Sequence, residues 1–139
     1  MIIKIRMGDF FPRIEHGTPT EDGRRCHILG ARVVELQGGI GVTEVAARNK
    51  DADGAYKGLD RIESAADEIR KRLPEERVTA NQLKTRAKQL KDIVHPYQTG
   101  YGGNGKLPKE VASAVESQVD AMGDHDLTIE GSSIAYCGG

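Results

Sequence analysis

Residues 59–73 read LDRIESAADEIRKRL, and the spacing of the apolar residues in this stretch decides the central part of the fold. These residues recur every three or four positions, at Leu59, Ile62, Ala66, Ile69 and Leu73. Side chains three and four positions apart lie on one face of an α-helix, so the stretch predicts an amphipathic helix with a single buried stripe. Pro74 follows directly, and proline ends a helix because it has no backbone N–H to donate.

Two further amphipathic helices are expected downstream of this one. Thr79 and Gln82 have the spacing of a capping box, which is typical of a helix N-terminus, and Pro96 ends the second helix. Pro108 suits the first turn of the third helix, and Gly123 closes it. Their apolar stripes are Leu83, Ala87, Leu90 and Val94, and then Val111, Val115, Val119 and Met122. The first two helices are joined by a short link, which predicts an antiparallel hairpin.

Strands are expected on both sides of this helical region. Residues 2–7, IIKIRM, alternate in a way that is typical of a strand with one buried face. The segment CHILGARVVELQGGIGV, which begins at Cys26, predicts two or three short strands broken at Gly30 and at Gly38–Gly39. Near the end of the chain, LTIEGSSIAYC alternates again and predicts a strand that returns beside the first one.

Together these elements indicate an α+β fold. Strands before the helices and a strand after them favour a small antiparallel sheet packed on a helical hairpin and a third helix. The expected domain covers residues 1–139, with strands over about 2–45, helices over about 59–122 and a C-terminal strand over about 127–137.

The composition narrows the classes of function. The 139 residues include 20 basic and 21 acidic side chains, which give a formal net charge of −1. A chain this neutral has no overall positive field to gather phosphates, which disfavours non-specific nucleic-acid binding. No apolar run approaches the roughly 20 residues of a membrane-spanning helix, and two cysteines do not make the disulfide framework of a small secreted domain. We therefore expect a soluble, cytoplasmic protein with no membrane partner.

Residues 49–60, NKDADGAYKGLD, carry oxygen ligands at the spacing of a calcium loop. Positions one, three, five, six and twelve are Asn49, Asp51, Asp53, Gly54 and Asp60. Calcium prefers carboxylate and amide oxygens, and glycine at position six allows a sharp turn. The stretch resembles an EF-hand loop, more narrowly the dockerin type, which implies that Asn49, Asp51, Asp53 and Asp60 bind calcium. The alternative is a polar turn at Asp53–Gly54 before a helix that Asp60 caps.

The stretch GYGGNGK, from Gly100 to Lys106, has the G-x-x-x-x-G-K spacing of a phosphate-binding loop. Such a loop needs a helix straight after it and a serine or threonine after the lysine, whereas Leu107 and Pro108 follow here. We interpret the stretch as a glycine-rich connection between helices, and such loops also carry binding function. No spaced catalytic motif is found, so no catalytic residue and no cofactor other than calcium is predicted.

The chain ends in SSIAYCGG, an expected strand that runs into Gly138 and Gly139. Together with the opening IIKIRM, this ending resembles ubiquitin-like and sulfur-carrier proteins of the β-grasp kind. The resemblance implies that the Gly139 carboxylate is activated and joined to a lysine, a sulfur or a cysteine. Glycine carries no side chain, so such a tail could enter a narrow enzyme channel.

Lys84, Lys88 and Lys91 follow one side of the second expected helix. A stripe of this kind could contact nucleic-acid phosphates. The alternative is that acids of the preceding helix, such as Asp60 and Asp67, face the lysines across the hairpin in a solvated, ion-paired surface.

Because no catalytic motif has the context that it requires, the sequence favours a non-catalytic protein-interaction or assembly module. Edge strands and a helical stripe would then serve as contact surfaces, and homo-oligomerisation is the natural expectation. Small accessory proteins of viruses and mobile elements are often of this type. The alternatives are a carrier protein that acts through its C-terminal Gly-Gly and a small nucleic-acid-binding protein.

Overall fold

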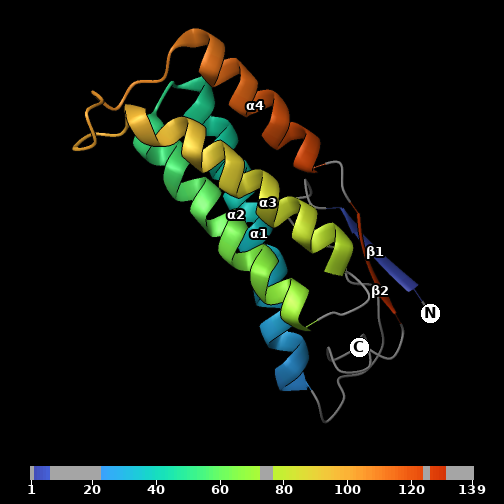
Figure 1. The fold of residues 1–139 in the computed structure, drawn as a ribbon. Helices are drawn as coiled ribbons and strands as arrows, with labels where there is room; N and C mark the ends of the chain where they lie inside the picture. The colour runs from blue at the N-terminus through green and yellow to red at the C-terminus, as the bar shows by residue number, and fades with distance from the viewer. Residues whose placement is uncertain (1, 7–22, 73–76, 124–125, 131–139) are drawn as a thin grey trace.

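A computed structural model describes residues 2–6, 23–72, 77–123 and 126–130 of the chain. Most of this part is helical, as Figure 1 shows. The elements are β1 (Ile2–Arg6), α1 (Gly23–Arg48), α2 (Ala52–Arg72), α3 (Arg77–Val94), the short 3-10 helix η2 (His95–Tyr97), α4 (Lys109–Gly123) and β2 (Asp126–Glu130).

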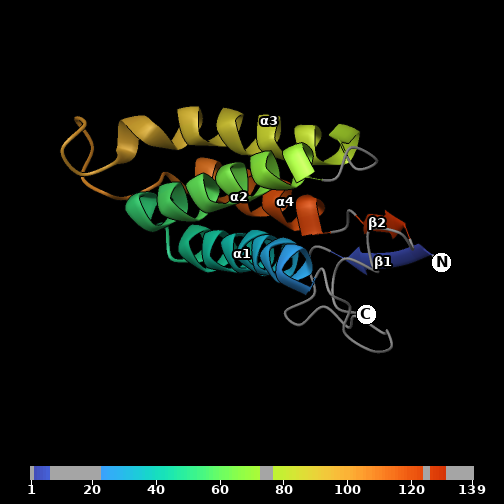
Figure 2. The same cartoon turned by 90° about the horizontal axis from the view of Figure 1, so that it is seen from below.

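The helices α1, α2 and α3 lie side by side, so that α2 is the middle helix of the three (Figure 2). Successive helices run in opposite directions, and residues 49–51 are the whole link between α1 and α2. The fourth helix, α4, packs mainly against α1 and makes only slight contact with α3. Among the described helices, none combines the length and the apolarity that crossing a bilayer would require.

The helices expected between residues 59 and 122 are present, and their apolar stripes form the core. Almost every residue of the three stripes is buried, and Val111 is partly buried against the core. Leu73 lies outside the described residues. The capping box predicted that the second helix begins at Thr79, and this is wrong. The α3 helix already begins at Arg77, so Thr79 lies within it. The α2 helix likewise begins at Ala52, well before Leu59.

The α+β prediction is wrong, because residues 23–48 form one helix and not a series of short strands. Gly38 and Gly39, which were expected to break strands, lie inside α1. The buried side of α1 includes Leu36, Ile40, Thr43 and Ala47, which are spaced three and four positions apart. The described fold is therefore a set of four packed helices.

Glycines at the crossing of α1 and α2 allow the two helices to pack closely together. A Cβ atom on Gly58 would collide with Thr43 Oγ1 and would lie 3.1 Å from the Gly39 carbonyl oxygen. Thr43 Oγ1 also donates a 2.6 Å hydrogen bond to the Gly39 carbonyl. Glycine disfavours a helix by about 1 kcal/mol relative to alanine, but here it permits a close approach of two helices and the packing that comes with it.

The two described strands form an antiparallel ribbon at one end of the helices (Figure 1). Ile2 pairs with Glu130 and Arg6 with Asp126. The first and last expected strands do lie beside each other, but this ribbon replaces the sheet that was expected to cover a helical hairpin. The rest of the strand expected up to residue 137 lies outside the described residues.

Candidate interaction surfaces

The glycine-rich connection after α3 folds back onto the link between α1 and α2. The Ala52 amide donates a 2.9 Å hydrogen bond to the Gly105 carbonyl, and the Leu107 amide donates one of 2.9 Å to the Lys50 carbonyl. Gly105 has φ +80°, a backbone conformation that favours glycine, and a Cβ atom there would lie 2.8 Å from Thr99 Oγ1. The glycines of this stretch therefore serve a tight fold against the helices.

The first part of the expected calcium loop forms the junction between two helices. The Asn49 amide donates to the Val45 carbonyl at 3.1 Å and ends α1. Asp51 caps α2, because its Oδ1 accepts a 3.0 Å hydrogen bond from the Gly54 amide. These residues build a helix end, a helix start and the turn between them.

The remaining carboxylates of that stretch lie inside α2. Asp53 accepts hydrogen bonds from the Thr99 amide at 3.0 Å and from Thr99 Oγ1 at 2.8 Å. Asp60 lies about two turns further along the helix, where Lys91 Nζ is 2.7 Å from its Oδ1. The twelve-residue helix–loop–helix arrangement is not formed, and no group of three or more His, Cys, Asp or Glu in the described residues is placed to hold a metal ion. Calcium binding stays a prediction.

An aromatic group lies beside the glycine-rich connection. The rings of His95 and Tyr101 are 4.5 Å apart between centroids, and those of Tyr56 and His95 are 5.8 Å apart. His95 Nδ1 lies 2.9 Å from Gln98 Oε1. Tyr101 is exposed, so this end of the molecule presents an aromatic surface that is held by the hydrogen-bonded connection.

Two of the three lysines in the expected basic stripe are paired with acids of α2. Lys84 Nζ lies 2.9 Å from Asp67 Oδ1, and Lys91 Nζ lies 2.8 Å from Glu63 Oε2 in addition to its bond with Asp60. Burial alone would lower the pKa of Lys91, but its hydrogen bonds to Asp60 and Glu63 outweigh that effect and raise it. This is the ion-paired hairpin that the sequence offered as the alternative. Within the described part of the chain, Lys88 makes no ion pair, and nucleic-acid contact by the stripe stays a prediction.

Asp67 is the most heavily paired acid of α2. Hydrogen bonds from Lys84, Lys71 and Arg70 hold the pKa of its carboxyl well below its usual range. The carboxylate therefore joins cations of its own helix to one cation of α3, across the α2–α3 packing.

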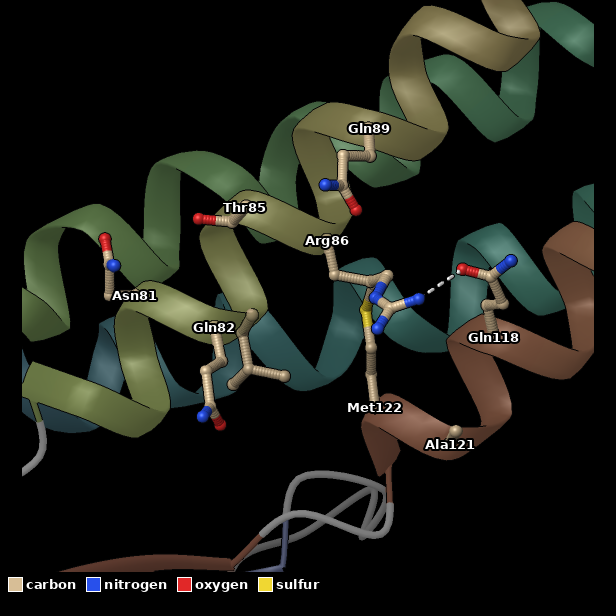
Figure 3. Close-up of a pocket in the computed structure, with 9 residues that line it drawn as sticks. Asn81, Gln82, Thr85, Arg86, Gln89, Gln118, Ala121 and Met122 are labelled. Atoms are coloured by element: carbon tan, nitrogen blue, oxygen red, sulfur yellow. Dashed lines mark hydrogen bonds between the residues drawn. The ribbon is translucent and has the colours of Figure 1, made fainter.

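A polar groove of about 570 Å³ lies between α3 and α4 (Figure 3). Arg86 Nη1 donates a 2.9 Å hydrogen bond across it to Gln118 Oε1. The other polar side chains of its lining are Asn81, Gln82, Thr85 and Gln89. These amides and hydroxyls can hydrogen-bond neutral polar groups, but the lining contains no His, Cys, Asp, Glu or Lys to act as a general acid or base.

The outer side of α1 is apolar and exposed. Val34, Val42 and Val45 are 52%, 42% and 55% exposed, and half-buried Gly38 and Gly41 lie among them. At about 100° per residue, all five positions fall on the side of α1 opposite its buried residues. In Figure 2, α2 and α4, the helices that pack on α1, both lie on the same side of it. We call these five residues the valine face.

A basic edge lies along the α2 side of the valine face. A Cβ atom on Gly38 would be 3.1 Å from Nη2 of Arg61, so this guanidinium lies against α1. Lys57 is exposed one turn earlier on the same side of α2. Neither cation has an ion pair with the described residues.

An acidic edge lies along the α4 side of the valine face. It comprises Glu44 of α1 with Glu116 and Asp120 of α4, and Arg48 Nε lies 2.8 Å from Glu116 Oε1. Burial raises the pKa of the Glu44 carboxyl, the charges of Asp120 and Glu116 raise it further, and Arg48 opposes them. Three acids and one arginine leave this edge negative.

The sequence prediction missed the valine face, because it treated the glycines of this segment as strand breaks. A signal was present in the spacing of Leu36, Ile40, Thr43 and Ala47, which follows the helical period and leaves the valines on the opposite side. Gly138 and Gly139 lie outside the described residues, so conjugation through them stays a prediction.

Comparison of the chain with protein-family models, with curated proteins and with solved structures gives no match.

Proposed function

We propose that this protein is a non-catalytic protein-interaction module that docks through the valine face of α1. The observation that carries the proposal is the row of exposed valines on a single helical face, with charged residues on both sides. A contiguous apolar patch with a polar rim is typical of a protein-interaction site, whereas single exposed apolar residues are common on any surface. Val78 on α3 is a residue of the second kind.

The physical cost of this face supports the proposal. Burying a valine side chain stabilises a protein by about 1.5–3 kcal/mol relative to leaving it exposed, and valine is also a weak helix former. Three exposed valines therefore contribute little to the folded chain alone, and they would contribute more beneath a partner. Edge cations and acids would set the orientation of that partner.

The other candidate surfaces give less support to a function. The α3–α4 groove offers hydrogen bonding by amides, a hydroxyl and the Arg86 guanidinium at an open surface, and the lysine stripe has two of its three cations paired within the molecule. We therefore rank the nucleic-acid-binding alternative below protein interaction.

The proposal is tested by placing a photo-crosslinking amino acid at Val42 in the full chain, in the cells that produce it. We expect one covalent adduct of defined mass, because the side chain would be covered by the partner. The matched control carries the same group at Val78, which is 72% exposed and lies away from the valine face. Equal crosslinking at the two positions, or none at Val42, would overturn the proposal.

A further inference from the structure

The valine face lies between edges of opposite charge, and this identifies the partner that it fits. Lys57 and Arg61 lie on one side of it, and Glu44 and Asp120 lie on the other. We propose that the partner is a second copy of this chain, in a twofold dimer whose two α1 helices run parallel. The inference rests on the proposed function, since it names the occupant of the same face.

Symmetry selects the parallel arrangement. A twofold axis along α1 places the basic edge of each copy against the acidic edge of the other, on both sides of the interface. A twofold axis across α1 gives antiparallel helices and places each edge against the same edge of the other copy. Like charges that face each other across an interface disfavour binding, so only the first arrangement is complementary.

The charged edges also lie at corresponding heights along α1. Arg61 lies against Gly38, and Gly58 packs on Thr43, which places Lys57 beside the residues that follow Gly39. Glu44 directly follows Thr43 on α1, and it lies close enough to Asp120 for that charge to act on it. In a parallel twofold dimer, equal heights face each other, so the Lys57 side chain of one copy reaches the Glu44 and Asp120 carboxylates of the other.

Two further properties favour a second copy. The formal net charge of −1 produces little repulsion between two chains. Valine has few side-chain conformations to lose on burial, and Gly41 carries no side chain that would hold two helices apart. Glu35 lies at the N-terminal end of the basic edge, which therefore carries two cations and one acid.

The arrangement is tested by disulfide crosslinking in the full chain with Cys26 and Cys137 replaced by serine. In a parallel dimer each position faces the same position in the other copy. Val34→Cys and Val45→Cys should therefore each form disulfide-linked dimers when oxidised alone. A disulfide needs Cα atoms within about 7 Å, so an antiparallel dimer would crosslink only in a mixture of the two variants. Val78→Cys is the control and should stay uncrosslinked.

A second measurement tests the charge argument. We expect the double change Lys57→Glu and Arg61→Glu to raise the dimer dissociation constant about tenfold or more, in sedimentation equilibrium at low salt. Adding Glu44→Lys and Asp120→Lys exchanges the two edges and should restore most of the affinity. Circular dichroism checks that each variant keeps its helices.

The outcomes separate this inference from the proposed function. Crosslinking of the single variants, with loss and recovery of affinity in the charge variants, supports the parallel dimer. Crosslinking only in the mixture, or a monomeric chain whose Val42 adduct has a mass other than twice 15.1 kDa, overturns the dimer and leaves the interaction face standing. No adduct at Val42 and no dimer would overturn both.

Discussion

At the scale of single residues, Gly58 and Thr43 set the distance between α1 and α2. The atoms nearest to a Cβ at Gly58 are backbone atoms and a hydroxyl that is already hydrogen-bonded to Gly39, so neither can move aside freely. A methyl group in this position must therefore separate the two helices.

We expect Gly58→Ala to lower the free energy of unfolding by about 1–3 kcal/mol, the usual cost of overpacking, although alanine is the better helix former. The control is Gly38→Ala, where the nearest atoms belong to the flexible end of Arg61 and no loss is expected. Urea unfolding of both variants at low protein concentration measures the difference. Equal stability of the two proteins would contradict the close crossing.

At the scale of elements, ion pairs connect α2 to α3 along the length of the hairpin. Asp67 forms an ion pair with Lys84 near one end of the hairpin. Asp60 and Glu63 form ion pairs with Lys91 near the other end. The side chain of Lys91 is only 15% exposed, so its pairing with two carboxylates is shielded from solvent more than a usual surface pair.

Acid should remove the contribution of Asp67. Its pKa is lowered in the folded protein, so the stabilisation is fully present above the unfolded-state pKa of about 3.9 and is lost as the pH falls through the lower folded-state value. We expect Asp67→Asn to lower the free energy of unfolding by about 1 kcal/mol at neutral pH, with this difference shrinking below about pH 4.

Urea unfolding of the wild type and Asp67→Asn as a function of pH measures this effect. Glu68→Gln is the control. Glu68 forms a single ion pair, with Arg72, and this pair is more exposed to solvent, so its loss should lower the stability less. A difference for Asp67→Asn that keeps its full size at the lowest pH would argue against the role of the charge.

At the scale of the whole molecule, dimerisation should couple stability to protein concentration. A partner that binds only the folded chain raises the melting temperature, and the effect grows with concentration. We expect the Tm of the wild type to rise by about 3 °C for each tenfold increase in concentration above the dissociation constant. In Val45→Glu the Tm should not depend on concentration, whereas Val78→Glu should behave like the wild type.

The difference between the expected and observed folds lies in the first half of the chain. The segment from Gly23 to Arg48 contains glycines and valines, which are poor helix formers, and local preference therefore favours strands or turns there. The packing of Gly39 and Thr43 on α2 compensates for that preference. Because strands were predicted for this segment, the valine face was not predicted either. The exposed side of a helix can be assigned only after the helix itself has been identified.

Three of the four helices, and the positions where two of them end, could be predicted from the amino-acid sequence alone. Apolar residues at helical spacing and the prolines after α2 and α3 act within a few residues of the chain, so they can be identified without knowing the fold. The tertiary fold established that residues 23–48 are helical despite their glycines, that Lys84 and Lys91 pair with acids of α2, and that three valines stay exposed. Each of these depends on contacts between residues far apart in the sequence. The spacing of apolar residues within one segment does not show which helix faces will pack against each other.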